Sequence, residues 1–277
     1  MSLYCNKFIF RGEIFDPPRS SRLGGVLLIL LIAGLALAQV LSGHPWGRWV
    51  FCAAALILPI ALVSGSIHTV HFNIFLLSHF LTDLFPHPSI YPFKWLTELM
   101  LYTYVVMLIP TLRGTVGWLR AGKLNAKVWL TLMAVAVLAV VALRGWVRDN
   151  SPDLSRYTGM LPNLPFGVLL VYGVAFAAFN AALEEITWRG VMMEALDSAF
   201  GAGYLSLVIQ ALSFGAAHYQ SGFPNGIPGT VITFVGGLLL GIIRRKSRGM
   251  LGCWIVHFFG DMVVFSLILS FVSKSGN

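Results

Sequence analysis

The residues best suited to chemistry in this chain are two adjacent carboxylates and an arginine, in the segment Glu184-Glu185-Ile186-Thr187-Trp188-Arg189. They follow an apolar stretch of a strongly apolar chain. Burying an ionised carboxylate is costly, so acids in such a setting are rare and usually functional. Arg189 comes one helical turn after Glu185 and can neutralise it. Glu184 then has no partner nearby in the sequence, which makes it a candidate for acid–base chemistry.

Two later motifs, Phe214-Gly215-Ala216-Ala217-His218 and His257-Phe258-Phe259-Gly260-Asp261, can complete a hydrolytic site. In each motif the first and last residues are four apart, so they share one face of a helix. Glu184 could act as a general base, with His218 sharing that work or polarising the attacking water. His257 could stabilise a developing oxyanion while Asp261 orients its imidazole.

The same side chains could instead bind a metal ion. Two imidazoles and a carboxylate are a plausible zinc set, and the metal-dependent version would use Glu184, His218 and His257. Spacing does not decide between the two, and we favour a mechanism without metal or other cofactor. An interfacial helix face, rather than another metal site, is expected for the remaining cluster of histidines, His68, His71 and His79.

The elements that must position these residues are membrane helices. The chain has 277 residues, of which 57% are hydrophobic and 11% charged, with a mean hydropathy of +0.79. Soluble domains carry about 25% charged residues, so the composition predicts an all-α, polytopic membrane protein. Apolar runs predict eight spans, at 24–41, 48–67, 95–112, 128–146, 165–186, 203–219, 229–243 and 250–272. The segment 67–85 could be a ninth span or an interfacial helix.

Basic residues lie between the apolar runs, so the net charge of +8 does not indicate nucleic-acid binding. Excess Lys and Arg is typical of cytoplasmic loops and predicts a cytoplasmic N-terminus, with Glu184 near a cytoplasmic helix end. The run Arg244–Arg248 is expected to determine topology and to contact anionic lipid. The basic clusters are Lys7, Arg11, Arg19 and Arg22; Arg113, Arg120, Lys123 and Lys127; and Arg244, Arg245, Lys246 and Arg248.

Small residues accompany the candidate site. Gly215, Ala216 and Ala217 precede His218, and the following apolar run contains Gly236, Gly237 and Gly241. Little side-chain bulk permits close helix approach. We therefore expect the helices that carry the motifs to pack around one polar pocket inside the membrane.

The ordered series EExxxR, FxxxH and HxxxD, on apolar helices, resembles the CAAX prenyl protease 2 family, also described as CPBP or Abi intramembrane proteases. The resemblance covers roughly residues 160–272. It implies a division into unassigned scaffold helices at 1–160 and a catalytic core at 161–277, within one membrane domain.

The resemblance also implies an integral-membrane endopeptidase and assigns roles to its residues. Glu184 and His218 would activate water, His257 and Asp261 would stabilise the oxyanion, and Glu185 and Arg189 would support them. The implied partners are the lipid bilayer and a membrane protein or peptide substrate, which could be prenylated.

Two other classes of function stay open at this point. A non-catalytic scaffold or immunity protein could keep the same fold, and a proton-coupled transporter could use the acids and histidines as a relay. Other protease chemistries fit less well, because the sequence has no HExxH, no second aspartate in a predicted span and no GxSxG around Ser206 or Ser213.

Overall fold

The computed structural model describes residues 22–41, 66–84, 93–155, 161, 164–220 and 222–275, and every regular element in these ranges is a helix. The predicted all-α class is confirmed. The helices in chain order are α1 (Arg22–Val40), α3 (Ile67–Leu84), α4 (Phe93–Leu108), α5 (Pro110–Arg113), α6 (Ala126–Asn150), α8 (Phe166–Glu185), the π-helical segment η2 (Ile186–Met192), α9 (Met193–Phe200), α10 (Tyr204–Ala217), α11 (Gly226–Ser247) and α12 (Leu251–Ser275).

Four of these helices are long and apolar enough to cross a membrane: α6, the continuous helix Phe166–Phe200, α11 and α12. Shorter apolar helices lie at Leu23–Ala38, Trp95–Leu108 and Tyr204–Ala217, each of which overlaps a predicted span. The predicted span at 48–67 lies almost entirely outside the described residues. The chain is therefore an integral membrane protein of the polytopic kind.

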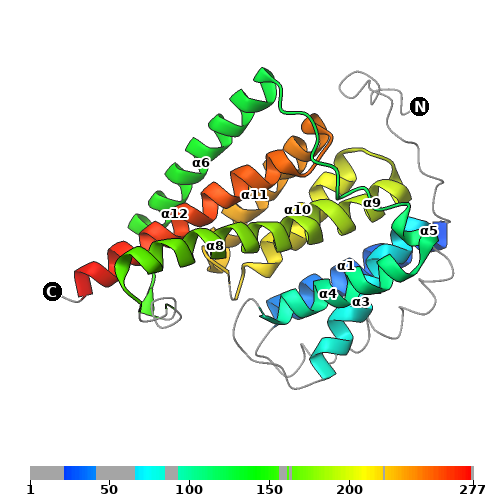
Figure 1. The fold of residues 1–277 in the computed structure, drawn as a ribbon, viewed down its shortest axis with the longest axis horizontal. Helices are drawn as coiled ribbons and strands as arrows, with labels where there is room; N and C mark the ends of the chain where they lie inside the picture. Colours follow the sequence, from blue (N-terminus) through cyan, green and yellow to red (C-terminus); the bar gives the residue numbers. More distant parts are fainter. Residues whose placement is uncertain are drawn as a thin grey trace.

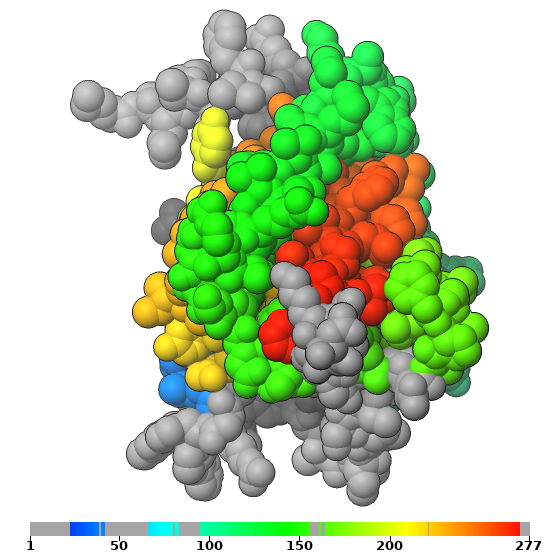
Figure 2. All heavy atoms as spheres, turned by 90° about the vertical axis from the view of Figure 1, so that its left-hand side faces the viewer, coloured from blue at the N-terminus to red at the C-terminus, as the bar shows by residue number. Residues whose placement is uncertain are grey.

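The helices form a bundle in which the C-terminal elements are central. Figure 1 shows α8 and α12 running side by side, with α6 next to α12 and with α1, α3 and α4 grouped on the other side. In Figure 2, α6 and the start of α8 flank α12 on one face of the molecule. Large apolar side chains on α6 and α8 are exposed, among them Leu130, Val137 and Val171. An apolar exterior of this kind is what a bilayer can solvate.

The helix that carries the two carboxylates does not end where the sequence predicted. The span was expected at 165–186, which would place Glu184 at a helix end, but the helix continues through η2 and α9 to Phe200. The prediction was wrong because the charges after Leu183 were taken to end the span. They are paired and buried instead, and Thr187 donates a hydrogen bond to the Leu183 carbonyl (2.9 Å) within the same helix. Glu184 thus lies in the interior of a long helix.

Glycines permit a close approach between α10, which carries the FxxxH motif, and α11. A Cβ on Gly215 of α10 would lie 2.9 Å from the Thr230 carbonyl oxygen of α11, and one on Gly237 would lie 3.1 Å from the Ala211 Cα. Gly241 contacts Leu207 and Gln210 in the same way, whereas Gly236 has nothing within 4 Å. Close approach therefore depends on one face of α11.

The N-terminal helices also pack onto the central helices. α1 contacts α9 and α10, and α3 contacts α9 and η2. Buried residues of α1, α3 and α4 form one hydrophobic cluster with Trp188, Met192 and Leu196 of the central helix. The division at residue 160 stays a prediction, and both sides of it contribute to the same core.

Candidate functional site

The site begins at the junction between α8 and η2. Glu184, Glu185 and Arg189 are all buried, with Arg189 completely inaccessible. The predicted ion pair is confirmed, since Arg189 Nη1 lies 3.1 Å from Glu185 Oε1. The Arg189 guanidinium also lies over the Phe214 ring, 4.3 Å from its centroid. A widened π-helical turn of this kind is frequent at functional sites, and here it contains Arg189.

His257 of α12 connects the two carboxylates. Its Nδ1 lies 2.7 Å from Glu185 Oε1, and its Nε2 lies 3.3 Å from Glu184 Oε2. Asp261, one turn later, approaches the same Nε2 at 3.7 Å. Each nitrogen of this buried ring therefore faces a carboxylate. In this arrangement Glu185 holds Nδ1, a contact that the sequence pattern did not predict.

Asn180 is a further member of the cluster. Its side-chain amide donates to Glu184 Oε1 at 3.3 Å and to Asp261 Oδ2 at 3.0 Å. These bonds join α8 to α12 and give the two acids a shared donor between them. Trp254 adds a second link between the helices, because its indole donates to the Ala178 carbonyl at 3.0 Å.

His218 ends α10 and reaches the cluster through Phe214. Its Nδ1 lies 2.9 Å from the Phe214 carbonyl oxygen, which can only accept, so Nδ1 carries the proton of this bond. The neutral ring then has its lone pair on Nε2. The Phe214 ring packs against His218, with 4.6 Å between centroids, and against His257 at 5.8 Å. His218 is also within electrostatic range of Glu184.

The structure thus brings all six predicted residues into one region, with the expected partner for Arg189 and a different one for His257. Asp261 was expected to orient His257, but Glu185 makes the shorter contact. Sequence reasoning missed Asn180, although it lies four residues before Glu184 and hence on the same helix face. It also missed that the phenylalanine of the second motif packs against Arg189 and both histidines.

The three residues of the metal-dependent alternative, Glu184, His218 and His257, all make contacts within the protein. No group of three or more His, Cys, Asp or Glu side chains in the described residues is arranged to hold a metal ion. His257 directs both nitrogens at carboxylates, and His218 uses one nitrogen on a carbonyl. Among the described groups, the buried site atoms without a hydrogen-bond partner are Glu184 Oε2, Glu185 Oε2 and the three guanidinium nitrogens of Arg189, although Glu184 Oε2 and Arg189 Nη1 take part in ion pairs.

The histidines of α3 lie apart from this site. His71 is buried, with Nδ1 2.9 Å from the Tyr102 hydroxyl and Nε2 2.9 Å from that of Thr115. His79 pairs with the buried Glu98 at 2.8 Å. These two rings therefore join helices inside the bundle and do not form the outward interfacial face that the sequence suggested.

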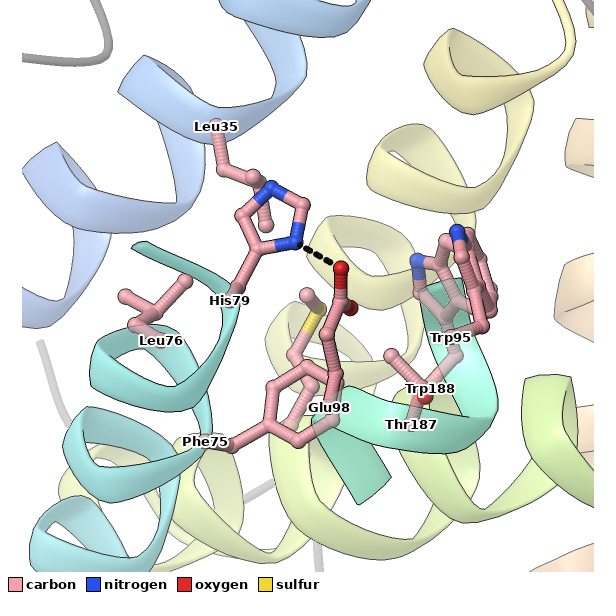
Figure 3. Close-up of a pocket in the computed structure, with 9 residues that line it drawn as sticks. Leu35, Phe75, Leu76, His79, Trp95, Glu98, Thr187 and Trp188 are labelled. Atoms are coloured by element: carbon pink, nitrogen blue, oxygen red, sulfur yellow. Dashed lines mark ion pairs between the residues drawn. The ribbon is translucent and has the colours of Figure 1, made fainter. Parts of the chain in front are cut away.

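A small, mainly apolar pocket separates the His79–Glu98 pair from the central helix. Figure 3 shows the pair on one wall, with Trp95 beside Trp188 on another. The rings of Trp95 and Trp188 are 5.4 Å apart. Thr187 and Trp188, which lie between Glu185 and Arg189 in the sequence, line this pocket. Residues of the N-terminal helices therefore lie directly beside η2.

Comparison with known proteins places the site within a family. Neither the curated proteins nor the solved structures contain a match to this chain. A protein-family model does match, over residues 165–263, somewhat more than a third of the chain, and this range includes every motif residue of the site. The matching model is that of the Rce1-like type II CAAX prenyl endopeptidases, so this part of the chain is similar to the family that its motifs resemble.

Proposed function

We propose that this protein is an intramembrane endopeptidase that hydrolyses a peptide bond of a membrane-associated protein or peptide. The observation that supports it most is the placement of His257 between Glu184 and Glu185, in the interior of the bundle and within the range matched by the endopeptidase family. A structural ion pair needs only one acid and one base. This cluster has three acids around one imidazole, which suits proton transfer.

Water activation is the role of Glu184 and His218. The Glu184 carboxylate takes a proton from water as the oxygen attacks the scissile carbonyl carbon. His218 Nε2, whose lone pair is free when Nδ1 donates to Phe214, accepts a hydrogen bond from the same water and orients it. Asn180 fixes Glu184 Oε1, which leaves Oε2 for the proton.

Oxyanion stabilisation is the role of His257 and Asp261. Because Nδ1 donates to Glu185, donation from Nε2 to the oxyanion requires a doubly protonated ring. The surrounding carboxylates compensate the charge of such a ring, and Asp261 keeps Nε2 directed into the site. The tetrahedral intermediate then breaks its C–N bond, and Glu184 returns the proton to the leaving amine, which gives a carboxylate and an amine.

The substrate class follows from the family name. Type II CAAX prenyl endopeptidases act on prenylated CAAX sequences, and an apolar exterior lets a lipidated segment approach from the bilayer. We therefore propose a membrane-associated substrate, with a farnesylated CAAX peptide as the first probe and the same peptide without the lipid as its control.

The decisive variant is Glu184→Gln, which keeps the shape of the side chain and removes its basicity. We expect it to lower kcat for the farnesylated peptide by about 10³-fold. Glu98→Gln is the matched control, because Glu98 is equally buried and also paired with a histidine, yet lies outside the site. It should keep cleavage within about threefold, since it removes no group from the reacting atoms.

Each outcome of this experiment has a clear meaning. Cleavage by Glu184→Gln at the unaltered rate overturns the assignment of the base. If the unaltered protein, reconstituted in vesicles, cleaves neither peptide and no other membrane-anchored peptide of a diverse library, the endopeptidase assignment itself is overturned. Unfolding temperatures of all variants in detergent exclude loss of fold as the cause.

A further inference from the structure

The irregular segment between α5 and α6 is fastened to the turn between α11 and α12. Three backbone hydrogen bonds join them: Lys123 N to Ser247 O (2.7 Å), Met250 N to Arg120 O (2.8 Å) and Leu251 N to Ala121 O (3.0 Å). Two glycines meet at this junction. Gly122 has a φ of +89°, and a Cβ on Gly249 would lie 2.1 Å from the backbone nitrogen of Gly122.

The junction brings two distant basic runs of the sequence together. Arg120 and Lys123 come from the basic cluster at 113–127, and Lys246 and Arg248 come from the run Arg244–Arg248. All four side chains are exposed, as is that of Lys127 at the start of α6. We call this group the basic junction; its members are Arg120, Lys123, Lys127, Lys246 and Arg248.

Arg244 and Arg245, the other arginines of the run Arg244–Arg248, do not have the expected role of contacting anionic lipid. Arg244 pairs with Glu194 at 3.0 Å, and Arg245 pairs with Asp197 at 2.6 Å. Both are partly buried, so they fasten α11 to α9 and are not available to lipid. In the part of the chain that the structure describes, no side chain of the basic junction makes an ion pair or hydrogen bond of this kind.

The position of the basic junction indicates which anion it meets. α6 begins at Ala126, α11 ends at Ser247 and α12 begins at Leu251, so three candidate membrane spans start or stop there. Trp129, one turn into α6, is 45% exposed. Exposed tryptophan beside cationic residues at the end of a span is typical of the headgroup level of a bilayer. At this level the abundant anion is the lipid phosphate.

We propose that the basic junction binds the headgroup of an anionic phospholipid, whose acyl chains lie along the exposed apolar face of α6 beyond Trp129. Backbone hydrogen bonds hold the main chain of the junction, so no loop has to become ordered on binding. Each cation near the headgroups strengthens such binding roughly fivefold. The like charges of the basic junction also repel one another, and a bound phosphate relieves that repulsion.

The test uses the full-length protein in neutral detergent and measures binding of a fluorescent phosphatidylglycerol, with phosphatidylcholine bearing the same fluorophore as reference. We expect the double variant Lys123→Gln/Lys246→Gln to weaken phosphatidylglycerol binding by more than about tenfold. Both side chains are exposed and the junction is held by main-chain atoms, so the variant should fold.

A matched control removes the same number of charges from the opposite end of α6. Arg144 and Arg148 are exposed near its C-terminus, and Arg144→Gln/Arg148→Gln should change phosphatidylglycerol binding by less than about twofold. Equal losses in the two double variants, or no preference of the unaltered protein for phosphatidylglycerol over phosphatidylcholine, would overturn the proposal. So would inorganic phosphate that displaces the labelled lipid at an equal concentration, because the site would then hold a free anion and not a lipid.

Discussion

At the scale of single residues, the two adjacent glutamates have separate partners. Glu185 receives both Arg189 and His257 Nδ1 on one oxygen, so it is compensated and fixed. Glu184 receives the Asn180 amide on one oxygen and faces His257 Nε2 with the other. These contacts support the proposed division, in which Glu184 exchanges a proton with substrate and Glu185 positions the imidazole.

This arrangement can be tested by exchanging the Asn180 amide and the Asp261 carboxylate. In Asn180→Asp a third carboxylate joins Glu184 and Asp261, which lose their shared donor and repel one another. We expect kcat/KM for the peptide probe to fall about a hundredfold, as for a small displacement of a catalytic group. Adding Asp261→Asn restores one amide and one carboxylate across the same 3.0 Å contact, and most of the activity should return.

The control for this exchange is Asp261→Asn alone, which places a second amide opposite Asn180. An amide oxygen can still accept from Asn180, so its loss should be smaller than that of Asn180→Asp. If the double variant is no better than Asn180→Asp, the amide does not position the acids through Asp261. Unfolding temperatures, measured in parallel, reveal the coupling of the pair even without turnover.

Metal removal tests the donor set at the same scale. A metal held by Glu184, His218 and His257 would have to separate His257 Nε2 from Glu184 Oε2, which lie 3.3 Å apart, whereas the contact of Nδ1 with Glu185 could stay. We therefore expect peptide cleavage to survive dialysis against a strong chelator, with elemental analysis used to verify removal. Loss of cleavage that zinc alone restores would instead assign these three residues as metal ligands.

At the scale of elements, the site depends on how closely α8 and α12 approach. α8 carries Asn180 and Glu184, α12 carries His257 and Asp261, and their separation sets every distance between the two groups. Gly173 of α8 lies directly against the ring of Phe265 of α12. Gly173 lies eleven residues before Glu184 on α8, and Phe265 lies four residues after Asp261 on α12, so the contact can be altered without replacing an acid of the site.

Gly173→Ala is expected to separate the two helices. Its Cβ would lie 2.2 Å from Cε1 of the buried Phe265, and overpacking of this kind costs about 1–3 kcal/mol. Turnover should fall at least about tenfold, because the histidine on α12 moves away from Glu184. Gly167→Ala lies on the same helix with nothing within 4 Å, and helix propensity favours it by about 1 kcal/mol. Equal activity of the two variants would show that the contact does not set the site.

At the scale of the whole molecule, the sequence predicted the class and the motif residues but not how they pair. Apolar runs, basic loops and small residues determine a helical membrane bundle directly, and four of the predicted spans correspond to α6, α8, α11 and α12. Spacing within one helix predicted the Glu185–Arg189 pair. Contacts between helices depend on rotation about their axes, which spacing does not give; hence the bond of Glu185 to His257 was not foreseen.

The helix ends were predicted less well for a related reason. Charge in an apolar run was taken as the end of a span, whereas buried pairing lets the helix continue through Arg189 to Phe200. The sequence predicts one role for the whole run Arg244–Arg248. In the structure Arg244 and Arg245 instead pair with Glu194 and Asp197 of α9 and are partly buried. In the first case an ion pair within the helix, and in the second ion pairs between α11 and α9, override the local composition.

The N-terminal helices should matter to the site although they carry none of its motifs. Trp95 of α4 packs on Trp188 of η2 at 5.4 Å, beside the pocket in Figure 3, and Trp188 immediately precedes Arg189. Trp95→Ala would enlarge that pocket and let η2 shift. Because Trp95 is only half-buried, we expect a stability loss below the ~3–5 kcal/mol of a fully buried tryptophan, together with a lower kcat.

Trp129→Ala provides the comparison for that variant, since Trp129 is 45% exposed on α6, away from η2. Thermal unfolding in detergent and peptide turnover should both respond to Trp95→Ala, and only weakly to Trp129→Ala. If Trp95→Ala lowers stability while kcat is unchanged, the N-terminal helices serve the fold alone. A fall in kcat at a temperature where both variants are folded would instead mean that these helices hold η2, and with it Arg189 and the paired glutamates, in the geometry that the reaction needs.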